Sequence, residues 1–349
     1  MPVPSPDAPA IDPNSTFDMA SAGKFITHIA ALQLVERGLI TLDDPIHPHL
    51  PELKHLNVLS KSANGDFSVK PATKKITLRH LLSYFSGIDH ESNPLIKEWR
   101  TFTASEEKEY QVWRKLEFNT SEPYTTPLLY EPGEGWIYGA SLIWTQVLVW
   151  RLTKVPFGKH VHDSVLKPIG MMSTVYNPED HPDIRGRVLQ MVKRDGDHLI
   201  PVENSTHGLV SSIPDFVRLM SDLLGPFSKI LRQEHVDLLF EPQFSPGSAA
   251  LKALRNDTEN YAFPAGIPPT MVEPAVNHSL AGLVIEDEMP LSKMPKGAVT
   301  WNGMPNLIWC LHKEKGLGMV FMTQLLPVDD EKTVDLAMEF FRGAWGKFG

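Results

Sequence analysis

The chain has 349 residues, of which 42% are hydrophobic and 21% charged, the balance of a globular protein with a substantial buried core. Its formal net charge of −9 at pH 7 argues against nucleic acid as a partner, because nucleic-acid binders usually carry a basic face. No segment approaches the roughly 18 apolar residues of a membrane span, and no secretory signal is visible at the start. The single cysteine, Cys310, excludes an internal disulfide and fits a reducing compartment, so we expect a cytoplasmic protein without a membrane partner.

The first elements of the chain are a lead-in and a long helix. Residues 1–16 are rich in proline and aspartate, and we expect them to be disordered ahead of a single domain over residues 17–349. The first strong helix signal runs from Ser21 to about Arg37, where apolar side chains lie on nearly every side, as in a buried helix. Gly38 is a suitable residue to end this helix.

Ser21 and Lys24 form a candidate nucleophile and base at the start of this helix. Side chains three residues apart on a helix share a face, so the lysine amine can reach the serine hydroxyl. The free backbone N–H groups and the dipole of a first helical turn favour the negative charge that develops on an attacked carbonyl oxygen. The pattern therefore favours acyl transfer through a serine ester.

The Ser-x-x-Lys spacing alone is a weak signal. It also occurs at Ser105–Lys108, among charged residues, and at Ser164–Lys167, just before a proline that tends to break a helix. Only Ser21 opens a long apolar helix. The spacing still leaves open that Ser21 is only a helix cap and Lys24 an ordinary surface residue.

A second helix, a cap and a third helix are expected in the middle of the chain. Thr77 is a suitable N-cap for a short helix that we expect to end at Ser86-Gly87. The aromatic-rich residues 88–131 are expected to form a cap over a pocket. After the turn at Glu131–Gly135, the apolar spacing predicts a buried helix over Tyr138–Leu152.

Toward the C-terminus the pattern alternates between helices and short strands. Residues 210–224 and 329–346 have the spacing of amphipathic helices. Strands are expected at 298–301, 306–312 and 318–324, joined by hairpin-like turns. We therefore predict an α+β fold in which an antiparallel sheet is flanked by helices, with a mainly helical part over residues 65–210.

Several segments, in the same order along residues 17–327, resemble the serine β-lactamase and penicillin-binding-protein superfamily, of which Ser-x-x-Lys is a recorded signature. The branch that is most similar is the fungal transesterase branch that includes the lovastatin side-chain acyltransferase. The matching segments are Met19–Lys24, Ala30–Gly38, Leu42–Pro45, Ile76–Ser83, Pro132-Gly133, Trp136–Gly139, Lys167–Met171, His207–Ser212 and Trp301–Asn306.

The resemblance implies a β-lactamase/transpeptidase-like fold, no cofactor, and a role for each matched residue. Ser21 would be the nucleophile, Lys24 its base, and Tyr138 the group that relays the proton to the leaving group. The backbone N–H groups of Ser21 and Met304 would form the oxyanion hole. The substrate-binding residues implied are Trp301, Asn302, Gly303, Trp136 and Tyr84.

Two departures from the family pattern stand out. Asn302 occupies a position where the branch usually has a second glycine. Family members also have two strands and a helix ahead of the nucleophile helix, whereas only 20 residues precede Ser21 here. The N-terminal strands are therefore expected to be missing, which would leave an exposed sheet edge. A truncated gene model, another element at that edge, or a loss of catalysis would each account for this.

The leading functional hypothesis is an acyltransferase of secondary metabolism. It would move an acyl group from a thioester or ester donor, carried by a protein or by CoA, to a hydroxyl of a natural product. Trp301 stands where β-lactamases have a lysine that helps to hold the substrate carboxylate. A carboxylesterase with the same acyl-enzyme is the alternative, and a non-catalytic binding protein is the second alternative. The histidine pairs His47/His49 and His160/His162 are expected to be surface residues rather than metal ligands.

Overall fold

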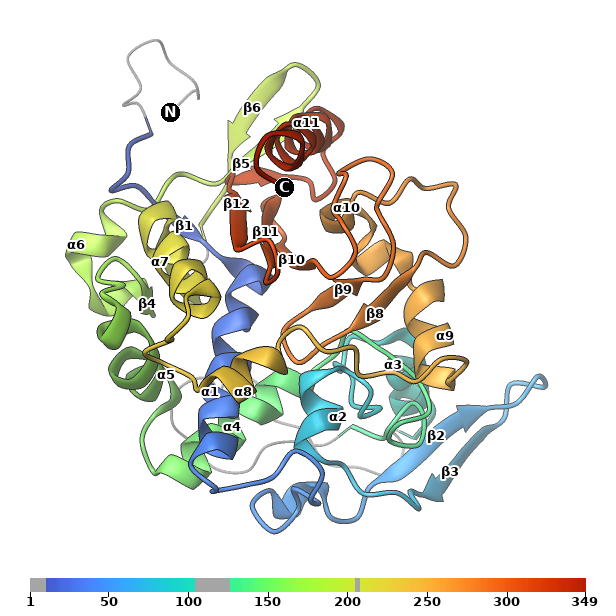
Figure 1. The fold of residues 1–349 in the computed structure, drawn as a ribbon. Helices are drawn as coiled ribbons and strands as arrows, with labels where there is room; N and C mark the ends of the chain where they lie inside the picture. The colour runs from blue at the N-terminus through green and yellow to red at the C-terminus, as the bar shows by residue number, and fades with distance from the viewer. Residues whose placement is uncertain (1–10, 104–125, 205–207) are drawn as a thin grey trace.

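The computed structural model describes residues 11–103, 126–204 and 208–349 (Figure 1). The strands are β1 (Thr16–Asp18), β2 (Asn57–Lys61), β3 (Phe67–Pro71), β4 (Val175–Tyr176), β5 (Val192–Asp195), β6 (His198–Pro201), β7 (Leu209–Ser212), β8 (Val276–His278), β9 (Leu283–Ile285), β10 (Val299–Gly303), β11 (Leu307–His312), β12 (Leu317–Phe321) and β13 (Leu325–Leu326). The helices are α1 (Lys24–Glu36), α2 (Leu78–Leu82), α3 (Pro94–Thr103), α4 (Ser141–Thr153), α5 (Phe157–Val161), α6 (Pro182–Arg185), α7 (Ile213–Leu224), α8 (Gln233–Asp237), α9 (Ala249–Asn256), α10 (Ala262–Ala265) and α11 (Glu331–Phe348). This mixture confirms the predicted α+β class.

The largest sheet is antiparallel and has five strands in the order β12-β11-β10-β9-β8. Because side chains alternate along a strand, its two faces pack on different helices. On one face Trp309 stacks on Phe25 of α1, with ring centroids 4.4 Å apart. On the other face Phe321 lies 6.1 Å from Phe340 of α11. All six residues of β11 are buried, since helices cover both of its faces.

Helix α1 lies in the middle of the molecule and is buried on every side, as the sequence predicts (Figure 1). Every residue from Phe25 to Leu34 is buried. It packs against α4. Gly38 has a φ of +67°, which confirms it as the residue that lets the chain leave the helix. The nucleophile candidates therefore stand at the end of a rigid, enclosed helix.

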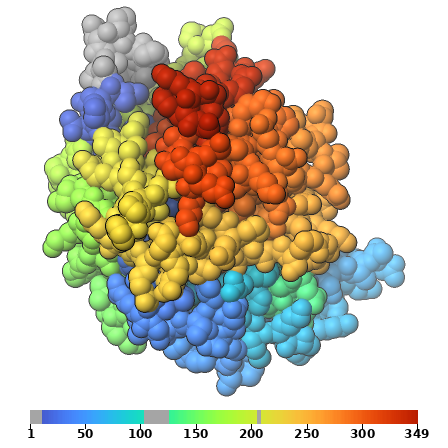
Figure 2. Space-filling view, viewed as in Figure 1, coloured from blue at the N-terminus to red at the C-terminus, as the bar shows by residue number. Residues whose placement is uncertain are grey.

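Three small sheets complete the fold. In one of them β1 pairs with β7, which pairs in turn with β4. A second joins β13, β5 and β6. The third is the β2–β3 hairpin, which projects from the body of the molecule at the lower right of the space-filling view (Figure 2).

The boundaries of several predicted elements are wrong by a few residues. Helix α2 begins after Thr77, whose side chain accepts a hydrogen bond from the His80 N–H as predicted, but it ends at Leu82 and not at Ser86-Gly87. Helix α4 begins at Ser141, so Tyr138 precedes the helix. Residues 210–212 belong to β7, and α7 starts only at Ile213. Element ends are set by long-range contacts that a local pattern does not contain.

The amino-terminal prediction also needs adjustment. Thr16, expected to belong to the lead-in, is fully buried and lies in β1, so the ordered part starts earlier. Strand β1 joins β7 rather than the five-stranded sheet. Among the described residues, β12 has no strand beside its outer edge. The helical part over 65–210 and the cap over 88–131 stay predictions, and residues 104–125 of that cap lie outside the described residues.

Candidate active site

Ser21 and Lys24 are brought into contact by a short 3-10 helix, η1 (Ala20–Gly23), which leads directly into α1. The sequence predicts an α-helix from Ser21 onward, so the exact geometry differs from the prediction. In a 3-10 turn the side chains at positions i and i+3 eclipse each other. Lys24 Nζ accordingly lies 2.8 Å from Ser21 Oγ and donates a hydrogen bond to it. Both side chains are partly exposed.

The turn before Ser21 is strained and held by side chains that the sequence does not single out. Ala20 has a φ of +43°, a conformation that L-residues with a Cβ rarely adopt. Its N–H donates to Asp18 Oδ1 at 3.0 Å. The backbone of Asp18 is held in turn by the amide of Gln324, at 3.0 Å and 3.1 Å. Asp18 lies close to Ser21 in the chain, but nothing in the sequence indicates that Gln324 reaches it.

Tyr138 lies against the lysine. Lys24 Nζ is 5.2 Å from the centre of the Tyr138 ring. Burial disfavours the phenolate, but the positive charge of Lys24 and hydrogen bonds from neighbouring side chains outweigh burial, so the pKa of the Tyr138 phenol lies below its usual value of 10. Those hydrogen bonds come from Ser21, Trp301 and Lys24. The Trp301 indole N–H donates to Tyr138 Oη at 3.3 Å.

Tyr84 forms the wall behind Tyr138. Its φ is +58°, an outlier for a bulky residue, and only 2% of its surface is exposed. Its ring lies 4.9 Å from that of Tyr138 and stacks at 6.3 Å on Trp301. Burial, and then the proximity of Tyr138 and a hydrogen bond to it, raise the pKa of the Tyr84 phenol well above 10. The Tyr84 hydroxyl therefore stays protonated and is a hydrogen-bond donor to Tyr138.

The end of β10 lies directly on η1. A Cβ added to Gly303 would come within 2.5 Å of the Met19 carbonyl oxygen, so only glycine allows this approach. The next residue, Met304, has an exposed side chain. Among the described residues, no hydrogen bond has the Met304 N–H as its donor. Asn302, one position before the glycine, is partly buried and lies opposite Ile308 in β11.

The aromatic residues that the sequence predicts for the site form one cluster. Trp136 is buried and its ring lies 6.3 Å from that of Tyr84, at an angle of 64°. Trp301 is 3% exposed. The structure thus brings Ser21, Lys24, Tyr138, Tyr84, Trp301 and Trp136 together, with the backbone of Gly303 beside Ser21.

Two buried histidines beneath this cluster were not identified from the sequence. His28 follows Lys24 by one helical turn, a spacing that did offer a signal. His278, at the end of β8, packs 5.6 Å from Tyr84 and 5.8 Å from Trp301. Burial lowers the pKa of His278 to about 4 and that of His28 well below 6.5, so both are neutral at pH 7.

The remaining predictions concern the paired histidines, metal ligands and membrane-spanning segments. His160, expected at the surface, is 6% exposed and lies 3.2 Å from Ser164 Oγ, because it faces inward from α5. Among the described residues, no three or more His, Cys, Asp or Glu side chains are grouped as metal ligands would be. Of the helices in that part of the chain, none is long and apolar enough to cross a membrane.

Known proteins and a family model match this chain over nearly its whole length. The family model described as "Beta-lactamase" matches residues 6–340. The protein "Acyltransferase calJ" of Penicillium decumbens is 29% identical, over 98% of this chain and 84% of that protein. "Lovastatin esterase" of Penicillium rubens is 30% identical, over 95% of this chain and 85% of that protein.

A solved structure shares the same architecture. Unliganded "Simvastatin Synthase (LovD) from Aspergillus terreus" superimposes with a TM-score of 0.85 at 25% identity. The match covers 99% of this chain and 88% of that chain. The predicted arrangement of sheet and helices is therefore the arrangement of an experimentally determined protein.

Proposed function

The chain belongs to the Beta-lactamase family, and we propose that it is a serine acyltransferase that forms an acyl-enzyme on Ser21. The acyl group would come from a thioester or ester donor and pass to a hydroxyl of a natural product. The observation that carries this proposal is the 2.8 Å contact between Lys24 Nζ and Ser21 Oγ, beside a tyrosine of lowered pKa. A serine hydroxyl next to a base is the arrangement of an activated nucleophile.

In the first half of the reaction Ser21 Oγ attacks the carbonyl carbon of the donor. Lys24 takes the hydroxyl proton across the 2.8 Å contact. The carbon–sulfur or carbon–oxygen bond of the donor then breaks. Tyr138 passes a proton to the leaving thiolate or alkoxide, which leaves the Tyr138 phenolate in contact with the protonated Lys24. The products are the Ser21 ester and a free thiol or alcohol.

In the second half the acceptor alcohol attacks the Ser21 ester. Tyr138 accepts the proton of the incoming hydroxyl, and its lowered pKa makes the phenolate available for this step. The donors Trp301 and Tyr84 stabilise the phenolate. The Ser21–carbonyl bond breaks, Ser21 regains its proton from Lys24, and the new ester leaves.

The carbonyl oxygen becomes negatively charged in both halves of the reaction. We assign its stabilisation to the backbone N–H groups of Ser21 and Met304. Support for this assignment comes from the close approach of Gly303 to η1 and from the Met304 N–H, which donates no other hydrogen bond among the described residues. Such donors typically contribute a factor of about 10²–10³ in rate.

The relatives support acyl transfer and also supply the alternative. One is named an acyltransferase and another an esterase, at almost the same identity to this chain. We favour transfer because the side chains around Tyr138 are aromatic and buried, and an apolar surrounding disfavours water as acceptor. A carboxylesterase with the same acyl-enzyme is the second candidate. A carrier-protein or CoA donor and a cytoplasmic compartment remain part of the proposal, the latter on the single buried cysteine, Cys310.

The test is to measure where the acyl group goes. The enzyme is incubated with the butyryl thioester of N-acetylcysteamine and cyclohexanol, and cyclohexyl butyrate and free butyrate are quantified over time. We expect the ester to exceed the acid, and Ser21→Ala to lower both rates by several orders of magnitude. Ser164→Ala is the matched control, because Ser164 has the same Ser-x-x-Lys spacing but lies elsewhere. Butyrate without ester, across several alcohols, would favour the esterase.

A further inference from the structure

The turn between β10 and β11 contains a buried asparagine in an unusual conformation. The connection consists of Met304, Pro305 and Asn306. Asn306 is fully buried and has a φ of +59°. Three-residue hairpin loops commonly need a left-handed residue at their third position, and glycine meets that need at the lowest conformational cost. An asparagine at this position therefore indicates that its side chain makes specific hydrogen bonds.

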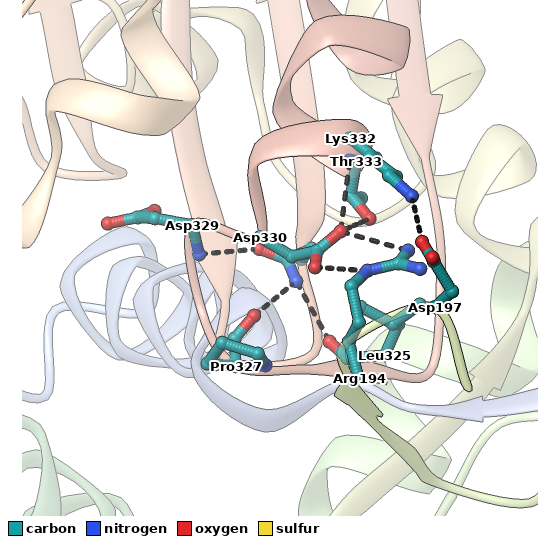
Figure 3. A network of polar contacts seen from close by, with 9 residues as sticks. Arg194, Asp197, Leu325, Pro327, Asp329, Asp330, Lys332 and Thr333 are labelled. Atoms are coloured by element: carbon teal, nitrogen blue, oxygen red, sulfur yellow. Dashed lines mark hydrogen bonds and ion pairs between the residues drawn. The ribbon is translucent and has the colours of Figure 1, made fainter. Parts of the chain in front are cut away.

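That side chain ties the turn to the segment that leads into α11. Asn306 Nδ2 donates to the carbonyl oxygens of Leu325 and Pro327, both at 2.8 Å. Its Oδ1 accepts the N–H of Asp329 at 2.9 Å. Figure 3 shows the three backbone groups converging from the 325–329 segment. Both amide protons and one acceptor site are thus satisfied without water.

The anchoring segment is itself held firmly at its far end. Asp330 caps α11 through the Thr333 N–H and receives two hydrogen bonds from Arg194, at 2.5 Å and 3.1 Å (Figure 3). On the turn itself, Thr323 Oγ1 donates to the carbonyl oxygen of Pro305. Hydrogen bonds therefore hold the turn at two consecutive residues, Pro305 and Asn306.

We propose that Asn306 is a positioning residue that directs the Met304 N–H into the oxyanion hole. This inference rests on the proposed function. Gly303 fixes one end of the turn against the Met19 carbonyl, and Asn306 fixes the other against the 325–329 segment. The Met304 peptide lies between these two anchors, and its own side chain is exposed and does not hold it. Without Asn306 the end of the turn away from Gly303 would keep the Thr323 hydrogen bond but lose its three contacts with the 325–329 segment.

The variant that tests this is Asn306→Gly. Glycine adopts the same φ without strain, so the backbone can stay while the three hydrogen bonds are removed. With p-nitrophenyl butyrate as the probe, we expect kcat to fall by about 10²-fold, with KM changed by less than about threefold, because the donor acts on the transition state. The affinity for butylboronic acid, which forms a tetrahedral adduct on a serine, should fall in parallel with kcat. Thr323→Val should lower kcat in the same direction but less.

Arg194→Met is the matched control, since it breaks the same network on the far side of Asp330. It is expected to lower the melting temperature and leave kcat within about twofold. If the Asn306→Gly variant has a lower melting temperature but the kcat and boronate affinity of the wild type, the inference is overturned. If Asn306→Gly does not fold, an unchanged kcat in Thr323→Val, which has no hydroxyl to donate to the Pro305 carbonyl, would overturn it. Wild-type enzyme that shows no turnover at all would instead contradict the proposed function.

Discussion

A tight turn, rather than the long helix alone, brings Lys24 onto Ser21. The i, i+3 spacing is visible in the sequence, and the eclipsed geometry of η1 turns it into a 2.8 Å contact. The partners of the pair come from distant parts of the chain. Tyr138 contributes a phenol of lowered pKa, and Trp301 donates a hydrogen bond to it. At the residue scale the proposed chemistry is therefore a property of the group of side chains and not of Ser21 by itself.

The contact between Trp301 and Tyr138 gives a prediction about pH. Replacing Trp301 by phenylalanine removes a donor that stabilises the phenolate, so the pKa of Tyr138 should rise toward its usual value. The phenolate is needed when the acceptor attacks the Ser21 ester, so where this half limits turnover kcat rises with pH through that pKa. The ascending limb of the pH profile for p-nitrophenyl butyrate should therefore move to higher pH in Trp301→Phe.

Trp309→Phe serves as a control for the loss of an indole, because Trp309 stacks on Phe25 and, among the described residues, its indole N–H has no hydrogen-bond partner. Its pH profile should keep the position of the wild type. An unchanged profile in Trp301→Phe as well would show that Trp301 does not act on the Tyr138 proton.

Among the elements, β10 and η1 form the contact on which the site depends. Gly303 has no space for a side chain, since an added Cβ would meet the Met19 carbonyl oxygen at 2.5 Å. Gly303→Ala must separate the strand from the nucleophile turn. We expect unfolding free energy to fall by about 1–3 kcal/mol, as for other overpacked sites. Activity should fall by about 10²-fold or more, because a shift of about 1 Å in a reacting group has that effect.

A second glycine provides the comparison for this measurement. Gly343 lies in α11, and nothing lies within 4 Å of the position of its Cβ. Gly343→Ala should therefore raise stability by about 0.5–1 kcal/mol and leave activity unchanged. Urea unfolding and esterase kinetics of the two variants distinguish a steric effect at β10 from a general effect of added methyl groups. Wild-type activity in Gly303→Ala would mean that the contact has no role in catalysis.

The elements also show which parts of the structure a sequence can predict. Helix α1 and strands β10 to β12 follow from local apolar patterns, and the structure has them within a few residues of the predicted places. The left-handed backbone of Tyr84 was not predictable, because only packing against Tyr138 and Trp301 requires it. The support of Asp18 by Gln324 joins residues 306 positions apart and has no local signal.

At the scale of the whole molecule, several neutral histidines lie in the interior. The folded-state pKa of His278 is about 4, below the 6.5 of an unfolded histidine. As the pH falls, the unfolded chain therefore binds the proton first, and stability is lost between about pH 6.5 and 4. Burial lowers the pKa of His28 and His80 as well, so all three act in the same direction.

The acid sensitivity of the fold should thus fall when His278 is removed. His278→Phe keeps an aromatic ring beside Tyr84 and removes one titrating group. For this one residue the loss of unfolding free energy from pH 7 to 4 is on the order of 3 kcal/mol, from the difference between the two pKa values. Urea unfolding at pH 7 and pH 5 should show a smaller decrease in the variant than in the wild type. An equal or larger decrease would contradict the assignment of His278 as neutral in the folded state.

The molecule as a whole places the Ser21 turn between a five-stranded sheet and a buried helix, in a fold that superimposes on an experimentally determined relative. Strand β1 anchors the segment before Ser21 to β7, so the nucleophile turn is held on the side of the lead-in as well. Sheet, helix and β1 therefore together fix the position of one hydroxyl group.

The most direct test of this account is intact-protein mass spectrometry after brief incubation with the butyryl thioester of N-acetylcysteamine. Wild-type protein and Ser164→Ala should gain the mass of one butyryl group, and Ser21→Ala should gain none. Peptide mapping should locate the group on Ser21, and cyclohexanol should remove it. No adduct on the wild type, with several acyl thioesters and with a fluorophosphonate probe, would contradict the central claim that this chain works through a Ser21 ester.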